Sequence, residues 1–147
     1  MPAKKTETDG FSAEERAAMK ARTAELRAEG KKGAKRADGL QAALDAIAKM
    51  SPEDRALAER VHVVVTATAP DLMPKTWYGM PAYANEDGKV VLFFKNGGKF
   101  NERYSTLGFE GAARLDDGDI WPVVYALTKW SPAVEQQVVA LVKAAIS

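Results

Sequence analysis

The strand-forming half of the chain begins with a stretch that reads Trp77-Tyr78-Gly79-Met80-Pro81-Ala82-Tyr83. Before it, apolar residues recur with helical spacing, and from Thr76 onward the spacing becomes that of β-strands. We expect one strand over residues 76–84, with Pro81 near its end or at a sheet edge. Alternation would place Trp77 and Tyr83 on one face, and Tyr78 and Met80 on the other, unless Gly79 and Pro81 introduce a bulge.

Turn residues divide the following segment into further strands. Residues 85–88 predict a turn, residues 89–95 an apolar strand, and residues 96–98 a second turn, because Asn and Gly tolerate the positive φ of tight connections. A strand is expected from 100 to 104, continuing to 109. After a polar crossing over 111–119, a buried segment over 120–127 favours one more strand, with Pro122 at its start or edge.

Four helices are expected around these strands. The first runs over 13–29 behind a capping box of Ser12 and Glu15, and its apolar face is weak. The second spans 39–49 with Asp38 as its cap. Ser51-Pro52 opens a third helix that ends before Pro70, although the β-branched run 61–65 leaves a strand as an alternative. Ser131-Pro132 repeats the same start signal for the last helix.

These elements predict an α+β fold with two layers, in which an antiparallel sheet of about four to five strands packs against helices. Residues 1–38 are expected to form an N-terminal helical extension followed by a basic linker over 31–38. Residues 39–147 then form the α+β domain. The first helix buries little and is interpreted as a peripheral arm on the domain or on a partner.

Composition excludes several classes of function. The chain has 21 Lys and Arg against 20 Asp and Glu, and its net charge of +1 argues against a dedicated nucleic-acid binder. No apolar run is long enough for a membrane helix, and residues 1–10 carry no apolar signal-peptide core. The chain has no cysteine, which excludes disulfides and thiolate chemistry and favours a cytoplasmic setting.

Catalytic signals are weak. The single histidine, His62, lies in the apolar third helix, where a tolerated helix residue is the better interpretation than a general base. Ser12, Ser51 and Ser131 are accounted for as helix caps, and no nucleophile elbow, phosphate loop or dinucleotide fingerprint is present. We therefore interpret the chain as a non-enzymatic protein, with a cryptic enzyme as the last-ranked alternative.

Metal binding is restricted to hard cations, because one histidine and no cysteine leave few soft ligands. Asp116, Asp117 and Asp119 place three carboxylates within four residues, which suits Ca²⁺, Mg²⁺ or iron. The spacing is not that of an EF-hand, and an exposed acidic turn is the simpler interpretation. No cofactor is predicted from the residues themselves.

Aromatic and basic residues of the strand region form the strongest candidate site. Rings beside cations bind flat or anionic ligands through stacking, cation–π contacts and charge-assisted hydrogen bonds. The alternative is that these rings are only core. The candidate ligand-binding residues, for an unknown small ligand or protein partner, are Trp77, Tyr78, Met80, Tyr83, Lys95, Lys99, Arg103 and Tyr104.

The motif Tyr78-Gly79-Met80-Pro81 with the following Tyr83 resembles a signature of the YdhG-like family, a domain-of-unknown-function group similar to frataxin and YjbR proteins. Gly88-Lys89-Val90-Val91, Leu115-Asp116-Asp117-Gly118 and Leu141-Val142-Lys143 fit the same resemblance, which runs from about Leu40 to the C-terminus. The resemblance implies an antiparallel sheet covered by helices, and it implies a cytoplasmic protein. Because some members are described as iron chaperones, it also implies a second hypothesis, iron binding at the acidic loop 116–119.

Overall fold

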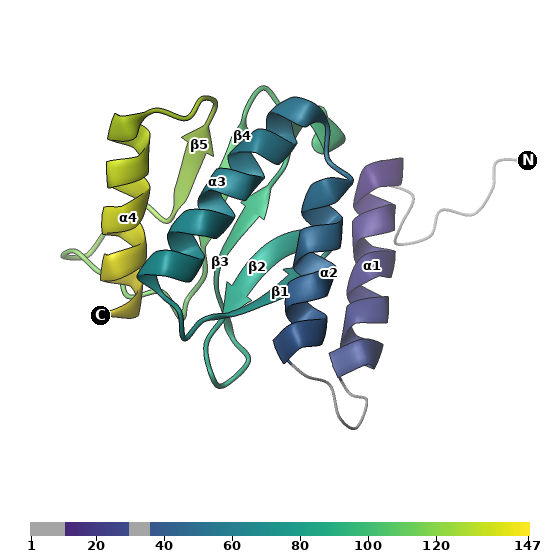
Figure 1. Ribbon diagram of the computed structural model, residues 1–147, viewed down its shortest axis with the longest axis horizontal. Coiled ribbons are helices and arrows are strands. Elements are labelled where there is room, and N and C mark those ends of the chain that lie inside the picture. The colour runs from purple at the N-terminus through teal and green to yellow at the C-terminus, as the bar shows by residue number, and fades with distance from the viewer. Residues whose placement is uncertain (1–10, 30–35) are drawn as a thin grey trace, which may run out of the picture.

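The computed structural model describes residues 11–29 and 36–147 (Figure 1). In chain order, the elements are α1 (Ala13–Glu29), α2 (Arg36–Ala48), α3 (Pro52–Thr68), β1 (Met73–Trp77), β2 (Met80–Ala84), β3 (Val90–Lys95), the 3₁₀-helix η1 (Gly97–Phe100), β4 (Ser105–Phe109), β5 (Val124–Leu127) and α4 (Pro132–Ile146). The basic linker expected over 31–38 lies largely outside the described residues.

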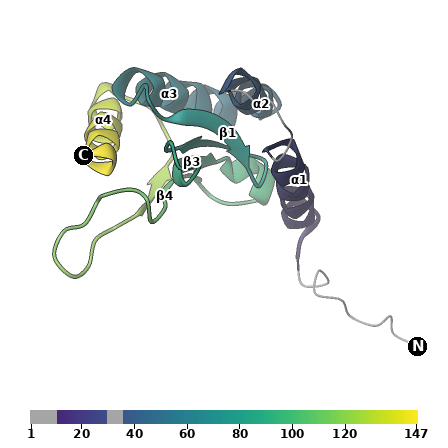
Figure 2. The ribbon, with the colours of Figure 1, turned by 90° about the horizontal axis from the view of Figure 1, so that it is seen from below.

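The five strands form one antiparallel sheet in the order β1-β2-β3-β4-β5, so each strand pairs with the next one along the chain. Figure 2 shows α2, α3 and α4 together on one face of this sheet. Helix α1 lies beyond the β1 edge, and the segment between β4 and β5 extends away on the other side. The predicted α+β fold, a sheet with helices packed on it, is confirmed.

The core lies between the sheet and the helices α2, α3 and α4. Val61 and Val65 of α3 and Val142 of α4 are fully buried against strand residues such as Leu92 and Phe94. The segment 61–65 is therefore helical, because its apolar side chains follow the helical spacing of α3 and all of that face finds partners. The side chains of Ser51 and Ser131 accept from backbone N–H groups three residues on, which confirms both predicted caps.

The stretch 76–84 is a hairpin, and the prediction of one continuous strand was wrong. β1 ends at Trp77, β2 begins at Met80, and Trp77 pairs with Met80 across a two-residue turn. Tyr78 and Gly79 both have positive φ, +53° and +78°, as a type I′ turn requires. The turn reverses the chain, so Trp77 and Tyr83 lie on opposite faces of the sheet rather than on the same one.

Three other boundaries differ from expectation. Residues 100–104 are not a strand: η1 ends at Phe100, and β4 starts only at Ser105. The segment 120–123 precedes β5 as a loop, and Ile120 is 89% exposed instead of buried. Pro122 has no N–H to donate to a ladder, which delays the strand to Val124. Helix α2 begins at Arg36, so Asp38 lies in its first turn and is not its cap.

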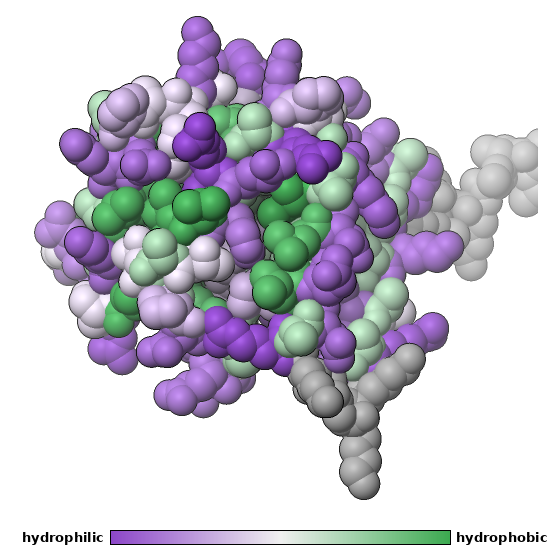
Figure 3. All heavy atoms as spheres, in the orientation of Figure 1, coloured by the Kyte–Doolittle hydropathy of each residue, from purple (hydrophilic) through white to green (hydrophobic). Residues whose placement is uncertain are grey.

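The helical side of the molecule is mainly polar. Figure 3 shows charged and polar side chains over most of this face, with apolar areas between the helices. Within the described ranges 11–29 and 36–147, no helix is long and apolar enough to cross a membrane.

Candidate functional site

The face of the sheet opposite the helices carries a row that begins with a lysine at the β1 edge and continues with small and apolar residues. Cross-strand partners place Lys75, Ala82, Phe93, Gly108 and Val124 side by side across all five strands. An antiparallel sheet with one face in water normally alternates apolar inward and polar outward residues. This row does not follow that rule, and α2, α3 and α4 all lie on the other face. We call it the open face.

Two aromatic rings form the centre of the open face. The Phe93 ring lies over Gly108 so closely that a Cβ atom at residue 108 would overlap it. The indole of Trp77 packs beside Phe93, with ring centroids 5.3 Å apart. Glycine at position 108 therefore lets Phe93 lie flat on the sheet, and Phe93 in turn supports Trp77.

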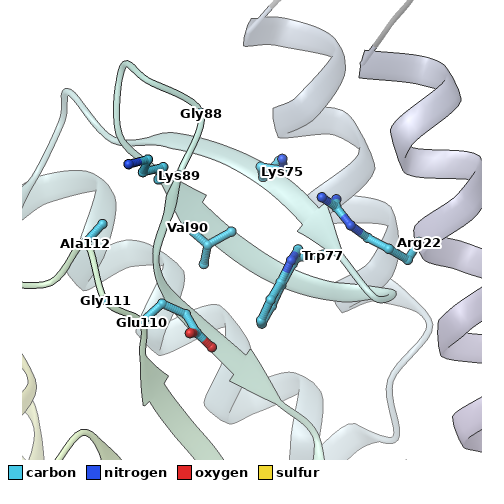
Figure 4. A pocket seen from close by; sticks show the side chains of 9 residues that line it. All are labelled: Arg22, Lys75, Trp77, Gly88, Lys89, Val90, Glu110, Gly111 and Ala112. Atoms are coloured by element: carbon cyan, nitrogen blue, oxygen red, sulfur yellow. The ribbon is translucent and has the colours of Figure 1, made fainter.

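A hollow of about 480 Å³ opens next to these rings. Figure 4 shows Arg22 reaching from α1 towards Trp77 and Lys75, with Val90 and Glu110 on the other side of the indole. Its volume falls in the range of small-molecule sites. We call it the Trp77 pocket, and its lining residues are Arg22, Lys75, Trp77, Gly88, Lys89, Val90, Glu110, Gly111 and Ala112.

The charges around the Trp77 pocket are unequally paired. Lys75 forms an ion pair with Glu29 of α1. The Nη1 atom of Arg22 is buried and has no hydrogen-bond partner among the described residues, since Glu25 and Glu29 are both 3.8 Å away. Such distances allow charge attraction but no hydrogen bond. Lys89 is exposed and makes no ion pair with the described part of the chain. The pocket therefore has cationic donors available.

Helix α1 forms one wall of this pocket through polar contacts. The carboxylate of Glu25 accepts from the backbone N–H of Tyr78 at 2.8 Å and from that of Gly79 at 3.0 Å. The guanidinium of Arg22 lies 5.7 Å from the centroid of the Tyr78 ring. Ala18 is the one residue of α1 that is buried, so apolar burial contributes little to its position.

The predicted ligand-binding residues separate into three places. Trp77 lines the pocket, and Tyr78 lies in the adjoining turn. Met80 is the cross-strand partner of Trp77 and is buried. Tyr83 lies in the core with no exposed surface, because the hairpin turn directs it to the helical face. Its place in the candidate site was a consequence of the missed turn.

The other predicted residues gather near η1 and do not line the Trp77 pocket. Lys95 pairs with Glu102 and lies over the Phe100 ring, and Lys99 approaches the same ring. Arg103 lies over Tyr104, with 5.2 Å between guanidinium carbon and ring centroid. These cations already have rings or a carboxylate within the chain, which makes them less available to a ligand than Lys89.

His62 and Tyr83 form a polar pair at the edge of the core. Nδ1 of His62 and the Tyr83 hydroxyl are 2.8 Å apart. Burial lowers the pKa of His62 below its usual 6.5 and raises the pKa of the Tyr83 phenol, so both groups are neutral at pH 7. The histidine expected to be a tolerated helix residue thus has a defined partner, and that partner is in the core.

The acidic loop contains no ready-made metal site. Asp116, Asp117 and Asp119 are exposed, and Gly118 between them has a positive φ of +68°. In the described ranges, no three or more His, Asp or Glu side chains are grouped so that they could hold a metal ion. Hard-cation binding by this loop stays a prediction from the sequence.

A second hollow of about 550 Å³ lies between α1, α2 and β1. Ala24, Ala28, Ala42, Met73 and Pro74 provide most of its apolar lining. Arg36 at its rim donates to the carbonyl oxygens of Pro70 and Leu72. Among the residues that the structure describes, no aromatic ring lines this hollow, so the Trp77 pocket is the better candidate for a planar ligand.

Sequence reasoning missed Arg22, Lys75 and Lys89. Lys75 lies two residues before Trp77, and the alternation of side chains along β1 would have placed both on the same face of the sheet. Arg22 belongs to a helix more than 50 residues earlier, and its sequence neighbours carry no signal of this contact. Searches against protein-family models, curated proteins and solved structures find no match for the chain.

Proposed function

We propose that the chain is a non-enzymatic binding domain whose Trp77 pocket binds a planar anionic small molecule. The observation that carries the proposal is the meeting of the Trp77 indole with Arg22, Lys75 and Lys89 around one hollow. An aromatic platform favours a flat ligand, and guanidinium and ammonium groups favour a carboxylate, sulfonate or phosphate. Glu110 on the rim adds an acceptor for a polar substituent.

The uncovered apolar face supports this proposal independently. Phe93 and Val124 lie on this face without a helix over them; Phe93 is half-buried and covers the buried Gly108, and Val124 is 59% exposed. Exposed apolar patches with a polar rim are typical of binding surfaces. The apolar part of a ligand would extend from Trp77 along this row.

A titration with 2-naphthoate, a planar carboxylate, tests the proposal. We expect saturable amide shifts in two-dimensional NMR spectra, centred on Trp77, Val90 and Ala112. The Trp77→Ala variant should weaken binding by about tenfold, since ring stacking is lost. The Lys89→Met variant should weaken it less, and added salt should reduce the affinity.

Matched controls come from the cluster near η1. Tyr104→Ala and Lys95→Met change an aromatic ring and a lysine outside the pocket and should leave the dissociation constant within about twofold. The neutral analogue 2-naphthylmethanol should bind more weakly than 2-naphthoate. The proposal is wrong if 2-naphthoate does not bind, or if its shifts centre on residues 95–104.

Membership in the YdhG-like family remains a proposal from the sequence motif alone. The iron-chaperone hypothesis depends on that resemblance and on Asp116, Asp117 and Asp119. No geometric observation favours it over the Trp77 pocket.

A further inference from the structure

Helix α1 is held to the domain by a carboxylate in a backbone anion site. Because Tyr78 and Gly79 both have positive φ, their successive N–H groups point to the same side of the turn and form a concave anion-binding nest. Both oxygens of Glu25 occupy it, one on each N–H. Hydrogen bonds to an ionised acceptor are about twice as strong as neutral ones.

The other contacts of α1 provide little additional attachment. Met19 and Leu26, its two large apolar residues beyond the cap, are exposed. The ion pair between Glu29 and Lys75 is close to solvent, where such pairs stabilise weakly. The position of α1 on β1 therefore depends chiefly on Glu25.

The same helix carries Arg22, whose charge is near Glu25 and Glu29 but whose Nη1 atom has no hydrogen-bond acceptor among the described residues. Arg22 lies one helical turn before Glu25 and lines the Trp77 pocket, and its buried Nη1 atom makes no hydrogen bond to the described residues. A buried charged donor without an acceptor is destabilising. An anionic group in the pocket would supply the acceptor and at the same time lie next to Lys75 and Lys89 of the sheet.

We infer that Glu25 is a positioning residue for the Trp77 pocket. Its hydrogen bonds to the Tyr78–Gly79 turn, which we call the latch, hold α1 against the sheet and so place Arg22 at the pocket. An anionic group bound between Arg22 and the lysines of the sheet would then hold α1 to the sheet more firmly. This inference rests on the proposed function. It assigns the anion to Arg22, and it couples ligand binding to the docking of α1. Because coupling between two equilibria is reciprocal, docked α1 strengthens ligand binding by the same factor by which bound ligand stabilises the docking of α1.

The first experiment measures the dissociation constant of 2-naphthoate in four forms of the full chain: wild type, Glu25→Ala, Arg22→Ala and the double variant. Glu25 does not line the pocket. Even so, we expect Glu25→Ala to weaken binding by about tenfold, the scale of one charge-assisted hydrogen bond. In the Arg22→Ala background, Glu25→Ala should have almost no further effect, since its action passes through Arg22.

The matched control is Glu14→Ala, which removes the same charge from α1 at a position without a contact to the turn. It should leave the dissociation constant unchanged. A second measurement, hydrogen exchange of α1 amides, should show about tenfold slower exchange at saturating 2-naphthoate in wild type. Glu25→Ala should speed exchange in α1 while α3 and α4 keep their protection, which shows that the domain stays folded.

Four results would overturn the inference. If Glu25→Ala binds 2-naphthoate as wild type does while Trp77→Ala fails to bind, the pocket stands and the latch does not. The latch is equally excluded if Glu25→Ala weakens binding as much without Arg22 as with it, or if the ligand leaves α1 exchange unaltered. Absence of 2-naphthoate binding in wild type would contradict the proposed function itself and the inference with it.

Discussion

Phe93 and Phe94 are neighbours in β3, and they lie in opposite environments. Phe94 points to the helical face, is 1% exposed, and belongs to the core with Leu107 and Val142. Phe93 points to the open face, where its partners are the Trp77 ring and the bare backbone of Gly108. One sheet therefore uses aromatic residues in two ways, as core on the helical face and as partly exposed support for Trp77 on the open face.

The difference between the faces teaches where stability and binding reside. The helical face is covered by three helices, so its residues lose nearly all contact with water. The open face also carries aromatic rings, but no helix layer covers it, and the cations of the Trp77 pocket lie near its β1 edge. Residues on the helical face should therefore govern unfolding, and those on the open face should govern ligand affinity.

The largest expected effect comes from comparing Phe94→Ala with Phe93→Ala. Phe94→Ala should lower the free energy of unfolding by about 3–5 kcal/mol, because it leaves a cavity among side chains that cannot collapse. Phe93→Ala should cost less than half as much, since part of its ring is already exposed. Urea unfolding of both variants measures the difference, and equal losses would contradict the assignment of the two faces.

The second prediction concerns the floor of the open face. Gly108→Ala should lower the free energy of unfolding by about 1–3 kcal/mol, because the new methyl group forces the Phe93 ring away from the sheet. In the Phe93→Ala background the same substitution should be almost neutral. A double-mutant cycle by urea unfolding tests this, and additive losses would mean that Phe93 does not rest on Gly108.

The third prediction concerns the turn that separates the faces. Gly79→Ala should lower the free energy of unfolding by about 1–2 kcal/mol, since φ at this position is +78°. Gly111→Ala is the matched control, because its added Cβ meets nothing and its φ is not in the strained range. Thermal unfolding compares the two variants. If Gly79→Ala melts at the same temperature as Gly111→Ala, the hairpin turn is contradicted.

The smallest effect is the pH dependence that His62 contributes on the helical face. Its folded pKa lies below the unfolded value of 6.5, so the unfolded chain binds more protons in between. The stabilisation by neutral His62 is complete above pH 6.5 and is lost as the pH falls towards the folded pKa. His62→Gln should flatten this slope in urea unfolding from pH 7.5 to 5, while Lys129→Gln on the surface should not.

Local signals predicted most of the fold because their partners are close in sequence. The Ser51 and Ser131 caps each bond an N–H three residues away. The spacing of Leu57, Val61 and Val65 indicates one helical face, and the turn residues after β2 and after β3 indicate an antiparallel meander. Trp77 was predicted as a candidate site residue for the same reason, because it lies in an aromatic segment, and it lines the Trp77 pocket.

The errors arose where a distant residue decides the local conformation. A Tyr-Gly pair is a weak hairpin signal because a tyrosine at positive φ is strained. Here the carboxylate of Glu25, more than 50 residues earlier in the chain, binds both N–H groups of that turn. Because the prediction missed this turn, it put Tyr83 on the same face as Trp77 and among the site residues, although Tyr83 belongs to the core.

The amino-acid sequence by itself determined the helices, the antiparallel class of the sheet and the aromatic segment of the candidate site, because each depends on spacing, capping or turn residues within a few positions. Only the tertiary structure decided which rings are core and which are open, and which cations meet Trp77. Arg22 of α1, Lys75 of β1 and Lys89 before β3 come together only through the docking of α1 and the pairing of strands. Such long-range contacts have no local pattern, since their energy arises only once the chain has folded.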